Sequence, residues 1–148
     1  MKILVSACLL GVPCRYDGKS KPCPAVLALE KTHELIPVCP EVDGGLTTPR
    51  SPAERQADGR VINTAGVDVT AEYRRGAGIA LRTATENGIS LAILKAKSPS
   101  CGCGRIYDGS FSRTLTDGNG ITAELLLSHG IRVVNEDALT DESLHLLH

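Results

Sequence analysis

The sequence has few aromatic side chains, no excess of charge and no long apolar run. Tryptophan is absent, and the 148 residues include one phenylalanine and three tyrosines. The 16 Lys and Arg residues nearly balance the 17 Asp and Glu residues, which argues against a protein that grips nucleic acid through a basic surface. No apolar run approaches the roughly 20 residues that cross a bilayer, so we expect no membrane segment. The short apolar start at residues 3–8 indicates a strand rather than a secretory signal, and we expect a cytoplasmic protein.

What the sequence does contain is typical of one globular domain. Its residues are 42% hydrophobic and 22% charged. A chain of this length can bury roughly two-thirds of its unfolded surface, which is enough for a core without disulfides. We therefore expect residues 1–148 to form a single domain.

Short apolar runs alternate with helical patterns along the chain. The apolar runs predict strands at residues 3–8, 35–39, 89–94 and 131–134. The helical patterns predict helices at residues 24–34, about 68–87, 121–129 and 139–147. This alternation predicts an α/β fold, a three-layer Rossmann-like domain with a mostly parallel sheet of about four strands. Residues 42–64 are expected to be a long loop with one helical turn near residues 52–57.

Six cysteines stand out against this ordinary composition. The cytoplasm keeps thiols reduced, so they indicate a metal, a cluster or redox chemistry, unless they are small buried core residues. Cys8 and Cys39 end the first and second predicted strands, and Cys101 follows the third after a short loop. Parallel strands end at one edge of a sheet, where open α/β folds bind their ligands. We therefore expect these three thiols to converge on a metal or cluster site.

The other three cysteines carry less information. No pair of cysteines has the Cys-x-x-Cys spacing of a thioredoxin-like motif, a zinc ribbon or a bacterial ferredoxin. Cys101 and Cys103 are close enough in sequence to donate two ligands together. We expect Cys14, Cys23 and Cys103 not to be ligands.

Candidate acid–base groups lie beside the second and third of these cysteines. Glu41 follows Cys39 by two residues, and Ser98 and Ser100 precede Cys101. A carboxylate at the edge of such a site can act as a general acid or base. The alternative is that Glu41 caps a helix and the serines form ordinary turn hydrogen bonds.

Three further side chains are candidates for binding a substrate. Tyr16 and Tyr107 occupy two similar Tyr-Asp-Gly loops, where an aromatic ring can stack on a planar ligand such as a nucleobase, although two plain turns explain the pattern as well. Arg50 lies in a stiff segment between two prolines. It is either an anion-binding residue or an ordinary surface arginine.

Taken in order, these segments resemble the DUF523 family, which includes a thiouracil desulfidase. The resemblance covers nearly the whole chain and rests on Cys-Leu-Leu-Gly at 8–11, Arg-Tyr-Asp-Gly at 15–18, Cys-Pro-Glu at 39–41, Gly-Gly-Leu at 44–46, Pro-Arg at 49–50, Gly-Val-Asp-Val-Thr at 66–70, Leu-Lys at 94–95, Ser-Pro-Ser-Cys-Gly at 98–102 and Ile-Tyr-Asp-Gly at 106–109. One departure is Arg113, which stands where we expect a glycine after Ser112.

The resemblance implies a [4Fe-4S] cluster held by Cys8, Cys39 and Cys101, with the fourth iron left for substrate sulfur. It further implies that a thiolated uracil exchanges its sulfur for oxygen from water without redox change. The acid–base roles then fall on Glu41 and on Ser98 or Ser100.

Two rival interpretations remain at this point. One is a non-enzymatic Fe–S sensor or carrier domain, in which Cys14 or Cys103 supplies a fourth ligand. The other is a zinc site at the same cysteines with hydrolytic chemistry. The expected partner is a small thiolated base, with no nucleic acid or membrane, and the expected assembly is a monomer or a small homo-oligomer.

Overall fold

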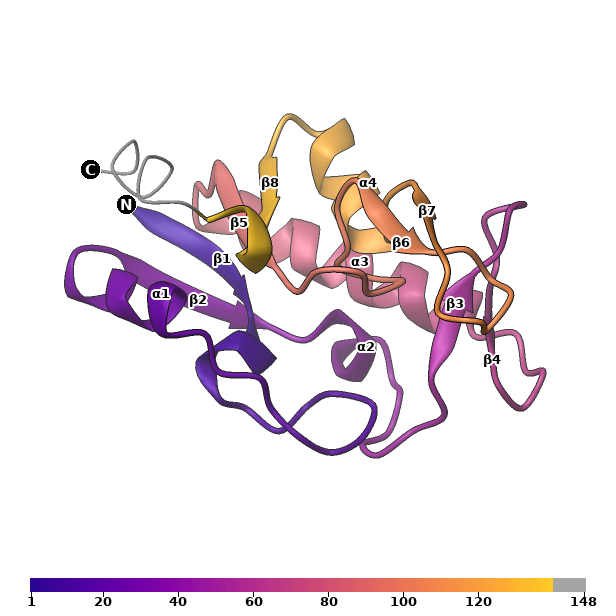
Figure 1. Cartoon of the computed structure of the whole chain (residues 1–148). Helices are drawn as coiled ribbons and strands as arrows, with labels where there is room; N and C mark the ends of the chain where they lie inside the picture. The colour runs from indigo at the N-terminus through magenta and orange to yellow at the C-terminus, as the bar shows by residue number, and fades with distance from the viewer. Residues whose placement is uncertain (140–148) are drawn as a thin grey trace.

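The fold is built on four parallel strands, as a computed structural model that describes residues 1–139 shows (Figure 1). The strands are β1 (Lys2–Ser6), β2 (Glu34–Val38), β5 (Leu91–Leu94) and β8 (Arg132–Asn135). They are arranged in the order β2-β1-β5-β8, and every neighbouring pair is parallel. The predicted parallel sheet is confirmed. The helix predicted at residues 139–147 falls almost wholly outside the described residues.

Both faces of the sheet are covered, which makes the expected three layers. Strand β1 sends Leu4 to one face and Ile3 and Val5 to the other, and all three side chains are fully buried. Leu4 packs in a core with residues of α3 (Thr70–Glu86) and α4 (Ile121–Ser128). Ile3 and Val5 pack with residues of α1 (Pro24–Leu27) and the 3₁₀ turn that follows it. Burial on both faces explains why the two central strands, β1 and β5, are nearly continuous apolar runs.

The helix predicted at residues 24–34 is shorter than expected. One turn of α-helix, α1, passes into a 3₁₀ turn at Ala28–Lys31, and β2 begins at Glu34. Val26 and Leu29 are the buried residues of this segment, and two short turns are enough to bury them. The sequence pattern therefore predicts helical structure here but not its division into an α-helical and a 3₁₀ turn.

The predicted helical turn near residues 52–57 is wrong. Strands β3 (Ala53–Arg55) and β4 (Val61–Asn63) form an antiparallel hairpin there. The Asp58-Gly59 pair makes its turn, with a left-handed φ of 92° at Gly59, and Val61 is fully buried under the start of α3. A helical turn would not place Val61 in this core.

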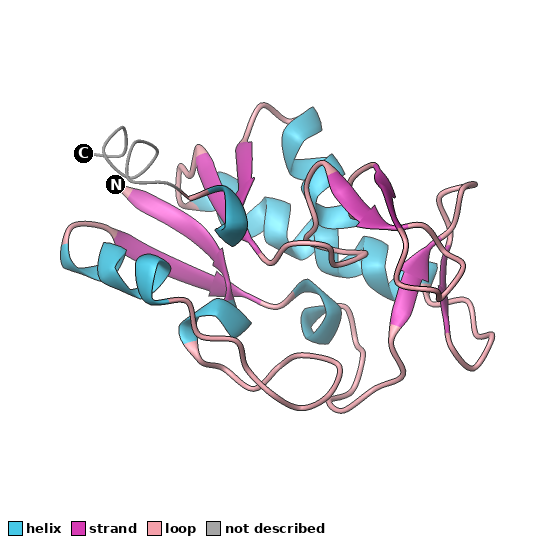
Figure 2. Ribbon diagram, in the orientation of Figure 1, coloured by secondary structure: helices cyan, strands magenta, loops and turns pink. Residues whose placement is uncertain are grey.

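A second hairpin was not predicted at all. Strands β6 (Arg105–Tyr107) and β7 (Leu115–Asp117) are antiparallel and enclose the loop that carries Phe111 and Arg113. Arg113 has a φ of 61°, the left-handed conformation for which glycine is favoured. Both hairpins lie together at one end of the molecule, apart from the four-stranded sheet (Figure 2).

Within residues 1–139, no helix is long and apolar enough to span a bilayer.

Candidate active site

A cleft of about 510 Å³ opens where β1, β2 and β5 end. The last residues of these strands or their immediate successors, Ser6, Val38 and Lys95, form part of its wall. The hairpin residues Glu54 and Tyr107 form part of the opposite side. The cleft is therefore at the carboxyl edge of the sheet, the ligand-binding edge of open α/β folds.

The thiols of Cys8, Cys39 and Cys101 all line this cleft, as the strand ends predicted. Cys8 lies in the 3₁₀ turn Ala7–Leu10 directly after β1, and Cys39 lies between β2 and the short helix α2 (Pro40–Asp43). Cys101 lies in the turn that follows β5. Cys8 and Cys101 are buried, and Cys39 is half-buried.

The local backbone holds two of these cysteines tightly. An added Cβ at Gly76 of α3 would meet the carbonyl oxygen of Pro40 at 1.7 Å, so α3 packs directly against the segment that carries Cys39. A Cβ at Gly120 would meet the carbonyl oxygen of Ser100 at 2.4 Å, so the start of α4 packs in the same way against the turn of Cys101. Only glycine allows these two backbone contacts.

Three thiols of the cleft, those of Cys14, Cys39 and Cys101, have a raised pKa and favour the protonated form in the absence of a cation. Burial raises the pKa of Cys101 to about 12. A hydrogen bond with the thiol of Cys14, together with burial, raises the pKa of Cys39. Contact with Cys39 lowers the pKa of Cys14, but contact with Cys8 and burial outweigh it and raise that pKa to about 11. A cation bound here would have to displace these protons, so its binding strengthens as the pH rises.

Cys14 belongs to the cleft, which the sequence did not reveal. It is buried, lines the cleft and contacts the thiols of Cys8 and Cys39. Its place in a Gly/Pro loop six residues after Cys8 was the only available signal. Cys103 lies elsewhere, with its thiol donating to the carbonyl oxygen of Val133 at 3.6 Å, and Cys23 packs against the core that contains Val26.

Glu41 projects into the cleft from α2 and is held by three other side chains. Its Oε2 accepts hydrogen bonds from Arg50 Nε at 3.0 Å and Nη2 at 2.6 Å, and its Oε1 accepts one from Ser98 Oγ at 3.3 Å. Tyr73, buried on α3, also hydrogen-bonds to this carboxylate, and burial together with the charge of Glu41 raises the pKa of Tyr73. Burial lowers the pKa of Arg50, but the attraction of Glu41 outweighs it, and the net shift is upward.

The two candidate serines occupy different environments. Ser98 lines the cleft, and its Oγ accepts hydrogen bonds from the backbone N–H groups of Ser100 at 3.0 Å and Cys101 at 3.1 Å. Ser100 does not line the cleft. It is fully buried, and its hydroxyl lies 2.8 Å from that of Thr122 in α4. Of the two, only Ser98 is placed to meet a molecule in the cleft.

The aromatic candidates are brought together at the rim. Tyr16 and Tyr107 both line the cleft, and Phe111 joins them from the loop of the second hairpin. Tyr16 and Phe111 are exposed, with 42% and 40% of their surface accessible. With Tyr73 of α3, which also lines it, all four aromatic side chains of the sequence border this cleft.

Sequence reasoning missed the site contributions of Ser6, Tyr73 and Lys95. Ser6 Oγ accepts a hydrogen bond from Lys95 N at 2.9 Å and also forms a hydrogen bond with the thiol of Cys101. Lys95 Nζ lies 3.2 Å from Oε2 of Glu136, the first residue of the 3₁₀ turn that follows β8. Tyr73 lies within the helix predicted at residues 68–87, and its hydroxyl reaches Glu41. Lys95 lies in the Leu-Lys motif, but no motif gives any of the three a role, because their roles arise from which strand ends and helix faces meet.

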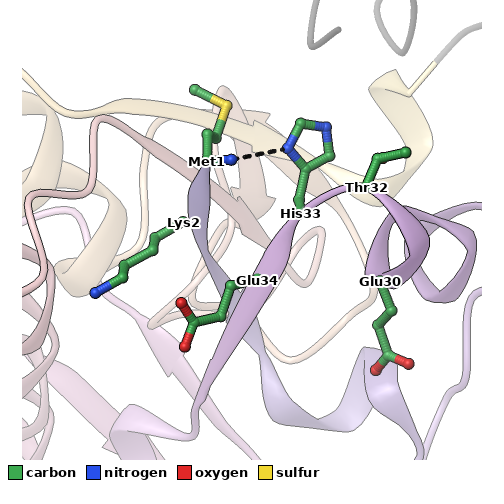
Figure 3. Close-up of a pocket in the computed structure, with 6 residues that line it drawn as sticks. All are labelled: Met1, Lys2, Glu30, Thr32, His33 and Glu34. Atoms are coloured by element: carbon green, nitrogen blue, oxygen red, sulfur yellow. Dashed lines mark hydrogen bonds between the residues drawn. The ribbon is translucent and has the colours of Figure 1, made fainter.

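A second hollow of about 340 Å³ lies at the opposite, amino-terminal edge of the sheet (Figure 3). The Met1 amino group lies 3.4 Å from His33 Nδ1 there. Its walls are Met1, Lys2, Glu30, Thr32, His33 and Glu34, with no thiol among them. The candidate cysteines, Glu41 and Ser98 line the cleft at the carboxyl edge instead.

The fold and the cleft define a Rossmann-like α/β protein with several cysteine thiols at the carboxyl edge of its sheet. Residues 3–138 match the model of the family described as 2-thiouracil desulfurase, and the chain belongs to that family. This confirms the DUF523 resemblance.

Two relatives support the assignment. The structure of the [4Fe-4S]-dependent thiouracil desulfidase TudS is similar with a TM-score of 0.90 and 51% identity, covering 99% of this chain and 97% of TudS. The uncharacterized protein YbbK of Bacillus subtilis (strain 168) is 40% identical in an alignment that covers 94% of this chain and 98% of YbbK.

Proposed function

We propose that this protein is a [4Fe-4S]-dependent desulfidase that removes the sulfur of a thiolated nucleobase such as 2-thiouracil. The observation that carries the proposal is the convergence of Cys8, Cys39 and Cys101 on one cleft that also contains Glu41 and Ser98. The family and the similarity to TudS support it. In the overall reaction water replaces sulfur, so that C=S and H₂O give C=O and H₂S with no change of oxidation state.

The residues of the cleft fit such a cluster. Iron–sulfur clusters are held by cysteine thiolates, and Cys8, Cys39 and Cys101 would supply three of them from three adjacent segments. When bound with one iron free of protein ligands, the cluster supplies a thiophilic Lewis acid that polarises the C=S bond. With three cysteines as its ligands, the cluster would keep that position for the substrate.

Within this proposal Glu41 is the general base. Its Oε2 is occupied by Arg50, so Oε1 is the atom that takes a proton from the attacking water. Ser98 donates its hydroxyl proton to the same Oε1. Once Oε1 carries a proton, that hydroxyl proton is free to turn toward the departing sulfur.

The rim of the cleft suits a flat, small substrate. We assign Tyr16 and Tyr107 to contacts with the face of the base, because both line the cleft and aromatic rings stack on planar heterocycles.

We further propose that residues 1–148 act as one domain in the cytoplasm, as a monomer or small homo-oligomer. All six cysteines are free thiols, as a reducing compartment would keep them.

One observation favours a second candidate, a non-enzymatic Fe–S or zinc domain. Cys14 contacts two of the three proposed ligands and is placed to become a fourth. In that case every iron would have a protein ligand and no position would be left for substrate. Loss of the cluster in Cys14→Ala would favour this candidate.

The test is anaerobic reconstitution followed by iron counting and sulfide release from 2-thiouracil. We expect a brown protein that turns over 2-thiouracil. Cys8→Ala, Cys39→Ala and Cys101→Ala should each lose the cluster, whereas Cys14→Ala, Cys23→Ala and Cys103→Ala should retain it. Normal iron loading in Cys39→Ala would contradict the ligand assignment, and an iron-loaded protein without turnover would contradict the enzyme.

The role of Glu41 has its own test in the same samples. Glu41→Gln should keep iron and substrate binding but lose about 10²–10⁴-fold in rate, the usual cost of a lost general base. Asp43→Asn, an exposed change on the same short helix, is the matched control and should leave the rate unchanged. A fully loaded Glu41→Gln with normal turnover would make Glu41 structural.

A further inference from the structure

Arg50 is bound through every N–H of its guanidinium group. Nε and Nη2 donate to Glu41 Oε2, and Nη2 also donates to the carbonyl oxygen of Cys14 at 3.0 Å. Nη1 donates to the carbonyl oxygen of Thr47 at 3.2 Å and to Thr48 Oγ1 at 3.1 Å. A guanidinium has five N–H donors, and these bonds use all of them. None remains for a substrate anion, so substrate binding is not the role its geometry supports.

These bonds join the segments that follow two different strands. The carbonyl oxygens of Cys14 and Tyr16, beyond β1, accept hydrogen bonds from the Arg50 side chain and backbone N–H respectively, the latter at 2.8 Å. Glu41, beyond β2, is the ion-pair partner. The side chain of Arg50 is only 8% exposed and that of Glu41 15%, so water screens the pair weakly. Arg50 thus fixes where the Glu41 carboxylate lies relative to the cysteine loops.

The orientation of the carboxylate follows from this arrangement. Two N–H groups of Arg50 saturate Oε2 from one side, which leaves Oε1 turned toward Ser98 and the cleft. We propose that Arg50 is a positioning residue of the desulfidation reaction, which holds Glu41 so that Oε1 faces the reacting carbon. The inference rests on the proposed function, and it replaces substrate binding as the role of Arg50.

The proposal makes Arg50→Lys an informative change. Lysine keeps the charge but is a point donor that cannot reproduce the paired bonds to Oε2 together with those to Cys14, Thr47 and Thr48. A misplacement of about 1 Å at a reacting group costs about 10²-fold in rate. We therefore expect kcat to fall by about 10- to 100-fold, with KM and iron content unchanged.

The matched control is Arg55→Lys. Arg55 is also partly buried, pairs with Glu124 and donates to the carbonyl oxygen of Asn119, but it does not line the cleft. Arg55→Lys should lose about as much thermal stability as Arg50→Lys but keep the wild-type kcat. A raised KM with normal kcat in Arg50→Lys would overturn the proposal, because that result belongs to a residue that binds substrate. Normal values of both in the iron-loaded variant would overturn it too.

Two further measurements keep the inference testable if Arg50→Lys folds poorly or if the enzyme activity fails. Thr48→Val removes one exposed support of Nη1 and should lower kcat several-fold without changing KM, and an unchanged kcat would count against positioning. Infrared difference spectra of the unloaded protein need no turnover. The difference spectrum between Arg50→Lys and the wild type should show a shifted carboxylate band. The same difference spectrum, taken with Glu41→Gln present in both proteins, should lack this band, which assigns it to Glu41. An unshifted band would overturn the positioning role, whereas absent turnover in the wild type with a shifted band would overturn only the proposed function.

Discussion

Gly76→Ala should displace Cys39 and Glu41, because the added methyl group would press on the backbone of Pro40 at the start of α2. The Cβ of an alanine at this position would lie 1.7 Å from the Pro40 carbonyl oxygen and 2.5 Å from its carbon, whereas ordinary contacts are 3.4 to 4 Å. Neither neighbour is a flexible side chain. The segment of Cys39, Pro40 and Glu41 must therefore move away from α3 by roughly 1.5 Å or more, which is a misplacement large enough to cost catalysis.

The sign of the stability change is decided by two opposing effects. Replacing a mid-helix glycine by alanine gains about 1 kcal/mol of helix propensity. Overpacking a close contact typically costs about 1–3 kcal/mol, and a backbone-to-backbone clash falls at the upper end of that range. We expect Gly76→Ala to destabilise the unloaded protein by about 2 kcal/mol and to lose most of its iron and turnover.

Gly78→Ala is the matched control, because it lies two residues away on the same helix and its Cβ would meet nothing within 4 Å. It should stabilise the protein by up to about 1 kcal/mol and leave iron loading unchanged. The assay is urea unfolding of both unloaded variants, followed by reconstitution and iron counting. If Gly76→Ala is as stable as Gly78→Ala and loads iron normally, the argument that α3 positions Cys39 and Glu41 is refuted.

Two further predictions concern the serines and the pH dependence. Ser100→Ala should cost about 1–3 kcal/mol in unfolding free energy, because it leaves the buried Thr122 hydroxyl unpaired, and should leave turnover intact. Ser98→Ala should instead lower iron retention and turnover, because it removes the acceptor of two N–H groups in the Cys101 turn, and the reverse result for the two serines would contradict their assignment. The unloaded protein should lose stability as the pH rises above about 9, because the pKa of Cys101 is 9.0 in its ordinary state and about 12 when folded, so the unfolded chain releases the proton first. Urea unfolding at pH 8 and 10.5 measures this loss, and a Cys101→Ala variant with the same pH dependence would show that another group is responsible.

The fold and the convergence of the cysteines could be predicted because they follow from strong local patterns. Buried parallel strands are continuous apolar runs, and their carboxyl ends must share an edge, so the positions of Cys8, Cys39 and Cys101 after strands were sufficient. The turn signal of Asp58-Gly59 was also present in the sequence. It did not lead to a predicted hairpin, because the two strands that flank it have three residues each and are too short to show alternation.

The rest of the site could not be predicted because it depends on contacts distant in sequence. Nothing local distinguishes Arg50 as the buried partner of Glu41 from an arginine on the surface. Ser98 and Ser100 are the same residue type in one short turn, and their roles are separated by contacts with residues distant in sequence, Glu41 for Ser98 and Thr122 for Ser100. Likewise Gly76 and Gly78 look alike in sequence, although an added Cβ would clash with the Pro40 backbone at Gly76 and would meet nothing within 4 Å at Gly78.

The most direct test of the central claim is the conversion of 2-thiouracil in H₂¹⁸O by anaerobically reconstituted protein, with sulfide and labelled uracil counted in the same sample. The proposed function predicts one sulfide released for each uracil formed, ¹⁸O in that uracil, and no product from the unloaded protein. Equal conversion by loaded and unloaded protein, or uracil without ¹⁸O, would contradict it.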